Sequence, residues 1–126
     1  MNRIRPLALV LTVAVAAAAA LATSAWSRPA AATLTGTVGP GFTISLTQGG
    51  KKVRTLKAGT YRLVVTDKAA IHNFVIEEEH GGKFEQTVTS VPFTGTKTVT
   101  VKLTRGSWKV YCAPHESVMF QKFTVS

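Results

Sequence analysis

The residues best suited to chemistry in this 126-residue chain gather in one short segment near its C-terminus. Cys112, His115 and Met119 place a thiol, an imidazole and a thioether at intervals of three and four residues. Alone, each has an ordinary role, because a free cysteine or a methionine commonly fills a hydrophobic core and a loop histidine is commonly solvated. Together they supply three donor atoms of the kinds that soft transition metals prefer. The segment therefore predicts a metal site.

A second imidazole can come from His72, forty residues earlier, on a neighbouring strand. Two imidazoles and a thiolate, with a weaker axial thioether, form the ligand set of mononuclear blue copper sites. The chain has three histidines, which excludes copper enzymes with several metal centres, and Cys112 is its one cysteine. A disulfide within the chain and a cysteine-rich zinc site are therefore excluded as well. His80, between three glutamates and two glycines, indicates a solvated hairpin turn, with a second metal site as the less favoured alternative.

The N-terminal residues predict an export signal. Arg3 and Arg5 precede the almost wholly apolar stretch Pro6–Ala22, and small residues follow it. This order is typical of a secretory signal peptide, and we expect cleavage after Ala25, with Ala32 as the alternative. An uncleaved membrane anchor is less favoured, because the seventeen apolar residues fall short of the roughly 20 that span a bilayer.

These boundaries give a signal peptide at residues 1–25, a short leader at 26–32 and one domain at 33–126. Without the signal peptide, thirteen Lys and Arg face six Asp and Glu, so the formal charge falls from +9 to +7. Such an excess attracts acidic surfaces in general, and no basic run favours nucleic acid. We expect a monomer in the periplasm or outside the cell, with no membrane span once the leader is removed. Thiols oxidise there, so an unpaired cysteine needs a reason such as metal binding.

From Thr33 onward, β-branched and aromatic residues alternate with recurring turn signals, which predicts an all-β sandwich or barrel. Residues 67–70 read as a turn between two of the strands. In the strand at 108–112, Trp108, Val110 and Cys112 share the inward face. The strands are expected at 33–38, 42–46, 52–56, 61–65, 71–76, 83–88 and 98–103, at 108–112, and in a last strand that places Met119, Phe123 and Val125 on one face.

Through two of its motifs, the chain resembles the cupredoxins, the small blue copper proteins. Residues 111–115, Tyr-Cys-Ala-Pro-His, are similar to the corresponding plastocyanin loop, and residues 71–74, Ile-His-Asn-Phe, to the upstream ligand strand of the family. The resemblance covers roughly residues 42–126. It implies a Greek-key β-sandwich of about seven to eight strands that binds one copper ion, Cu(I) or Cu(II), through His72, Cys112, His115 and Met119.

The same resemblance gives roles to three neighbouring residues. Asn73 would tie the ligand loop to the strand of His72 through hydrogen bonds. Pro114 has no N–H group and so cannot donate to the Cys112 sulfur. Tyr111 would offer a second electron route, as in plastocyanin, and its alternative is an ordinary outward strand tyrosine. The spacing from His115 to Met119 lies between those of plastocyanin and amicyanin, so no subtype is assigned.

The expected function is that of an exported type 1 copper protein that carries single electrons between redox partners. By family analogy, electrons pass through His115, an apolar patch around it docks the partner, and Lys and Arg side chains steer acidic partners. One alternative is a copper-binding module for storage, delivery or tolerance. Another is a metal-free interaction domain. An enzyme is the least favoured, since no nucleophile and base remain after the four ligands.

Overall fold

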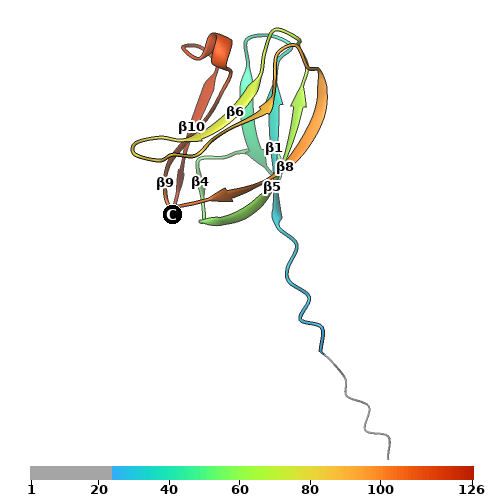
Figure 1. Ribbon diagram of the computed structural model, residues 1–126, viewed down its shortest axis with the longest axis vertical. Helices are drawn as coiled ribbons and strands as arrows, with labels where there is room; N and C mark the ends of the chain where they lie inside the picture. Colours follow the sequence, from blue (N-terminus) through green and yellow to red (C-terminus); the bar gives the residue numbers. More distant parts are fainter. Residues whose placement is uncertain (1–23) are drawn as a thin grey trace, which may run out of the picture.

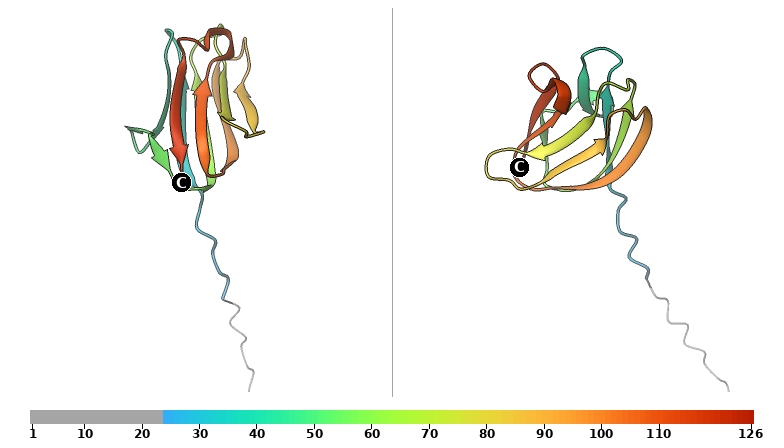
Figure 2. Two further views of the ribbon diagram at one scale, coloured as in Figure 1. Left: turned by 90° about the vertical axis from the view of Figure 1, so that its left-hand side faces the viewer. Right: turned by 45° about the horizontal axis from the view of Figure 1, so that its top comes forward.

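Two five-stranded β-sheets pack face to face in the computed structural model, which describes residues 24–126 (Figures 1 and 2). Almost all of the expected signal peptide lies outside these residues. Residues 24–31 run away from one end of the sandwich as an exposed extended segment. Between Ser24 and Ser126, no helix has the length and apolar character needed to cross a bilayer.

The first sheet contains most of the N-terminal half of the domain. Its strand order is β3-β2-β1-β5-β8, and β1 and β5 run parallel while the other neighbours are antiparallel. The strands are β1 (Ala32–Val38), β2 (Ile44–Gln48), β3 (Lys51–Lys52), β5 (Gly59–Asp67) and β8 (Gly95–Leu103).

The second sheet has the order β4-β10-β9-β6-β7 and carries the C-terminal segment. Its strands are β4 (Thr55–Leu56), β6 (Phe74–Glu78), β7 (Glu85–Thr89), β9 (Gly106–Tyr111) and β10 (Phe120–Val125). The chain crosses between the sheets after β3, β4, β5, β7 and β8, and a 3-10 turn, η1 (Ala113–His115), precedes β10. The all-β sandwich is confirmed, and eight strands remain when the two-residue strands β3 and β4 are set aside.

The predicted inward faces fill the space between the sheets. Trp108, Val110 and Cys112 are buried along β9 and its end. Buried residues also come from β8 (Val101 and Leu103) and from β10 (Phe123 and Val125), where they alternate with exposed threonines and lysines, and Met119 is buried just before β10. The alternation of period two is therefore confirmed in the second half of β8 and in β10, whereas in β9 Lys109 and Tyr111 on the other face are covered as well.

The ends of most expected strands are shifted by one to three residues, and two of the differences have a clear structural cause. The strand at 71–76 begins only at Phe74, because the His72 N–H donates to the Ala69 carbonyl and closes a turn there. The strand at 52–56 is divided between the two sheets, with β3 pairing to β2 and β4 to β10. The turn at 67–70 starts one residue later than predicted, since Asp67 is the last residue of β5.

One close contact between the sheets requires a glycine. A Cβ atom on Gly36 of β1 would lie 2.7 Å from two ring carbons of Phe74, the fully buried first residue of β6. Only a residue without a side chain lets the two sheets approach this closely. The contact sets the position of Phe74, and thereby of His72 two residues before it.

Candidate metal centre

His72, Cys112 and His115 meet at the end of the sandwich opposite the N-terminal segment, where η1 lies (Figure 1). The two histidine Nδ1 atoms are 3.2 Å apart. Cys112 Sγ lies 3.7 Å from His72 Nδ1 and 3.6 Å from His115 Nδ1. His72 and Cys112 are fully buried, whereas His115 is partly exposed. The structure thus brings together three of the four predicted ligands.

The size of this triangle suits a small metal ion. Three atoms 3.2, 3.6 and 3.7 Å apart lie on a circle with a radius of about 2.0 Å. Bonds from imidazole nitrogen and thiolate sulfur to a metal such as zinc are about 2.0–2.3 Å long. The three donors therefore fit around one ion with little movement.

The protonation of His72 is set by its other ring nitrogen. His72 Nε2 lies 2.9 Å from the Gly41 carbonyl oxygen, which can only accept a hydrogen bond. The proton of the neutral ring therefore belongs on Nε2, and Nδ1 presents its lone pair to Cys112 and His115. A carbonyl that orients an imidazole in this way is typical of metal-ligating histidines.

Phe42 covers the two imidazoles from outside. Its ring meets His72 edge-on at 5.4 Å between centroids and His115 at 4.9 Å. The expected strand at 42–46 begins instead at Ile44, so Phe42 lies in the connection from β1 to β2, next to Gly41. Phe42 is exposed on its far side. The sequence offered no signal for this contact, because the residue stands outside both metal motifs.

The loop that carries Cys112, His115 and Met119 is closed by its own backbone. The Cys112 N–H donates to the Met119 carbonyl at 3.0 Å, and the His115 and Met119 N–H groups donate to the Cys112 and His115 carbonyls. The Met119 side chain is buried directly before the first residue of β10. The loop thus returns Met119 to the neighbourhood of Cys112, as the spacing predicted, while Pro114 is exposed within η1.

Asn73 links the two motifs directly. Its side-chain oxygen accepts a hydrogen bond of 2.7 Å from the Ala113 N–H, which joins the residue after His72 to the residue after Cys112. This is the kind of bond that the resemblance assigned to Asn73. It restrains the distance between the two motifs whether or not a metal is bound.

A buried polar chain that sequence reasoning missed supports the strand of His72. Asp67, at the end of β5, accepts hydrogen bonds from the Thr89 hydroxyl at 2.8 Å and from the Ala69 N–H at 3.2 Å. The Thr89 hydroxyl oxygen in turn accepts from the Phe74 N–H. Asp67 and Thr89 are buried, so the chain fixes both sides of the turn that presents His72. In the sequence, the one indication of this hydrogen-bonded chain was the acidic Asp67 at a strand end.

Tyr111 lies beside Cys112 but does not face solvent freely. It is 7% exposed, and its hydroxyl donates a hydrogen bond of 2.5 Å to Glu85. The Lys109 ammonium lies over its ring, 4.6 Å from the centroid. Burial, followed by the hydrogen bond to Glu85 and the nearby Glu77 charge, raises the pKa of the Tyr111 phenol. The tyrosine is therefore a covered strand residue.

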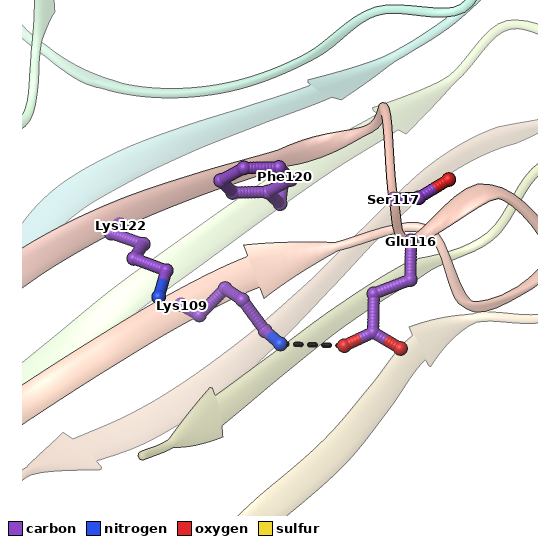
Figure 3. A pocket seen from close by; sticks show the side chains of 5 residues that line it. All are labelled: Lys109, Glu116, Ser117, Phe120 and Lys122. Carbon is purple, nitrogen blue, oxygen red and sulfur yellow. Dashed lines mark hydrogen bonds and ion pairs between the residues drawn. The ribbon is translucent and has the colours of Figure 1, made fainter.

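Lys109 is the centre of an ion cluster on the outer face of the second sheet. Its ammonium lies 2.8 Å from a carboxylate oxygen of Glu77 and 2.7 Å from one of Glu116. Burial alone would lower the pKa of Lys109, but the hydrogen bonds and charges of Glu116 and Glu77 outweigh it and raise the pKa to about 12. Figure 3 shows Lys109 and Glu116 beside a shallow hollow that Ser117, Phe120 and Lys122 also line.

His80 stands apart from the cluster of donors. It is exposed, with a φ of 57°, in the hairpin between β6 and β7 that its glycine neighbours predicted. Within residues 24–126, His72, Cys112 and His115 are the one group of at least three His, Cys, Asp or Glu side chains that converge closely enough to hold a metal.

Comparison with solved structures identifies the fold. Rusticyanin from Thiobacillus ferrooxidans is similar at 24% identity and a TM-score of 0.50, over 75% of this chain and 76% of that one. Auracyanin A, a "blue" copper protein from the photosynthetic bacterium Chloroflexus aurantiacus, is similar at 16% identity and a TM-score of 0.53, over 77% of this chain and all of the other. No protein-family model and no curated protein sequence matches the chain.

The fold is therefore that of the cupredoxins, which confirms the resemblance read from the two motifs. At these identities the likeness establishes the fold alone, and the ligands have to be argued from the residues of this chain.

Proposed function

We propose that His72, Cys112, His115 and Met119 hold one copper ion, with Met119 as the weaker fourth ligand. The observation that carries the proposal is the triangle of two imidazole nitrogens and one thiol sulfur, preformed at the dimensions of a metal centre. Thiolate and thioether favour Cu(I), imidazole accepts Cu(II), and the combined set is that of blue copper sites. The cupredoxin fold adds independent support.

The activity that follows is the carriage of single electrons. Copper supplies one-electron redox chemistry by alternating between its two oxidation states. The chain's own residues hold the geometry nearly constant during that change. Gly41 and Asn73 fix the two motifs through the hydrogen bonds described above, and the buried Cys112 keeps water from the sulfur. Little rearrangement is then needed on transfer, so exchange is fast. No enzymatic activity is proposed.

Electrons enter and leave through the partly exposed ring of His115. Apolar side chains surround this end of the molecule: Phe42 is 59% exposed and Val118 is 66% exposed. A small apolar patch excludes water and lets a partner approach closely, while the basic charge of the chain steers partners with acidic docking surfaces. A second route through Tyr111 stays a prediction, and its burial makes it the less direct of the two.

We further propose that the protein works outside the cytoplasm, as a monomer in the periplasm or at the cell surface. The basic and apolar N-terminal segment supports export. In an oxidising compartment, coordination of the thiolate would also explain how one unpaired, buried cysteine persists.

The test is titration of the purified protein with Cu(II). We expect one equivalent to produce an intense blue colour through thiolate-to-copper charge transfer, and Cys112→Ser to abolish it. Reversible one-electron voltammetry should accompany the colour. Tight binding without colour or reversible voltammetry would contradict electron transfer and favour copper storage or delivery. Failure to bind copper would overturn the metal site itself.

A further inference from the structure

Lys109 is an unusually enclosed cation for the outer face of a sheet. Its side chain is 11% exposed, and its ammonium contacts the carboxylates of both Glu77 and Glu116. The neighbouring cation Lys122 on β10 is 59% exposed and pairs with Glu79 at 3.3 Å. The two lysines thus share a face and a type of partner but differ in enclosure.

Lys109 and its two partners lie on the three segments that bear the predicted ligands. Lys109 precedes Cys112 by three residues on β9, and Glu116 directly follows His115 in the loop. Glu77 lies on β6, the strand that begins two residues after His72. One ammonium group therefore ties the loop of His115 to the two strands that present the other donors.

The exposed tip of the loop depends on this contact. The backbone bonds between Cys112 and Met119, and the bond from Asn73, restrain its base. Among the hydrogen bonds and ion pairs of residues 24–126, the one between Lys109 and Glu116 alone links the tip at 116–118 to residues outside the loop (Figure 3).

We propose that Lys109 and Glu116 are positioning residues for the metal centre. Their ion pair holds the tip against the sheet, so that His115 faces Cys112 before any metal arrives. The effect on the metal centre rests on the proposed function, whereas the contact itself does not, because the ion pair involves none of the four proposed ligands. Exposed ion pairs contribute little. Here Glu116 is 54% exposed, but Lys109 is only 11% exposed and has Glu77 as a second partner, so its ammonium is already held in place.

The first experiment uses the copper-free protein. Hydrogen exchange of the segment 112–119 should be about two- to fivefold faster in Glu116→Gln and Lys109→Met than in the wild type, as expected for the loss of one restraining ion pair. Lys122→Met is the matched control, since it removes a cation from the same face without touching the loop. Lys109→Arg should exchange as slowly as the wild type, because it keeps the positive charge.

Equal exchange in the wild type and Glu116→Gln would overturn the proposal. Glu116 is exposed, so that substitution leaves the folded core untouched and the result cannot be attributed to unfolding.

The second experiment uses the copper-loaded protein. The charge-transfer band and the spin-resonance spectrum should broaden or shift in Glu116→Gln and Lys109→Met and stay unchanged in Lys122→Met. Lys122→Met removes the same positive charge as Lys109→Met, and Glu116→Gln removes a negative one. A change shared by the two loop variants and absent from Lys122→Met therefore reports geometry rather than electrostatics. If the copper-loaded wild type is not blue, the proposed function is contradicted. The hydrogen-exchange experiment on the copper-free protein then still tests whether the ion pair restrains the loop. A blue wild type whose loop variants match it in both measurements overturns the positioning role.

Discussion

Substitution of Gly36 by alanine tests the contact that sets the position of Phe74 and, through it, His72. The new methyl group would lie 2.7 Å from two carbons of the Phe74 ring and 3.0 Å from a Val65 methyl carbon. Both neighbours are fully buried, so neither can move without disturbing the core. Overpacking of this kind costs about 1–3 kcal/mol. For a domain of this size, the melting temperature should then fall by roughly 5–20 °C.

The assay is thermal unfolding of the copper-free protein followed by circular dichroism. Gly41→Ala is the matched control, because a Cβ there meets no heavy atom within 4 Å and the position does not have the positive φ that favours glycine. Phe74→Leu in the Gly36→Ala background should recover part of the loss by vacating space. A Gly36→Ala protein that melts together with the wild type would refute the claim that the sheets are in tight contact at this point.

Three further predictions follow from the site and its surroundings. Asn73→Ala removes the acceptor of the Ala113 N–H and should lower the free energy of unfolding by about 0.5–1.5 kcal/mol in urea titrations, whereas an unchanged midpoint would contradict the link between the motifs. The free energy of unfolding should decline above about pH 10. The reason is that the folded chain holds the protons of Tyr111 and Lys109 more tightly than the unfolded chain. The contribution of Lys109 is complete below its ordinary pKa of 10.5 and is lost as the pH rises toward about 12. Denaturation curves from about pH 9 to 12 check the sign, and Lys109→Met should flatten them. Copper at a hundred times its dissociation constant should stabilise the folded state by about 2.7 kcal/mol in calorimetry, and equal stabilisation of Cys112→Ser would place the ion elsewhere.

Period-two alternation made the core of this protein predictable. The inward face of β9 followed from Trp108, Val110 and Cys112, because alternate residues share one face of a strand and these three side chains are the apolar set that fits the core. The predicted start of the strand at 71–76 was wrong, because contacts between elements, and not periodicity, decide where this strand begins. His72 is held by a turn and by the Gly41 carbonyl of the β1–β2 connection, and Thr89 of β7 accepts from the Phe74 N–H. None of these interactions produces a periodic pattern in the sequence.

The donor residues of the site could be predicted from the sequence, but the residues that surround and position them could not. The spacing of Cys112, His115 and Met119 identified the chemistry, since few other roles require those three side chains together. Phe42, Asp67 and Thr89 could not be found in this way, because their roles depend on contacts across the sandwich. Lys109 was equally hidden, since on a strand it reads as an ordinary outward lysine, and only the folded loop shows that Glu116 returns to meet it.

X-ray absorption at the copper edge of the loaded protein tests the central claim most directly. We expect two nitrogen donors and one sulfur donor at about 2.0–2.3 Å from the copper ion. These distances agree with the radius of the triangle formed by His72, Cys112 and His115. A shell of nitrogen and oxygen without a short sulfur bond would show that Cys112 is only a core residue and would contradict the account.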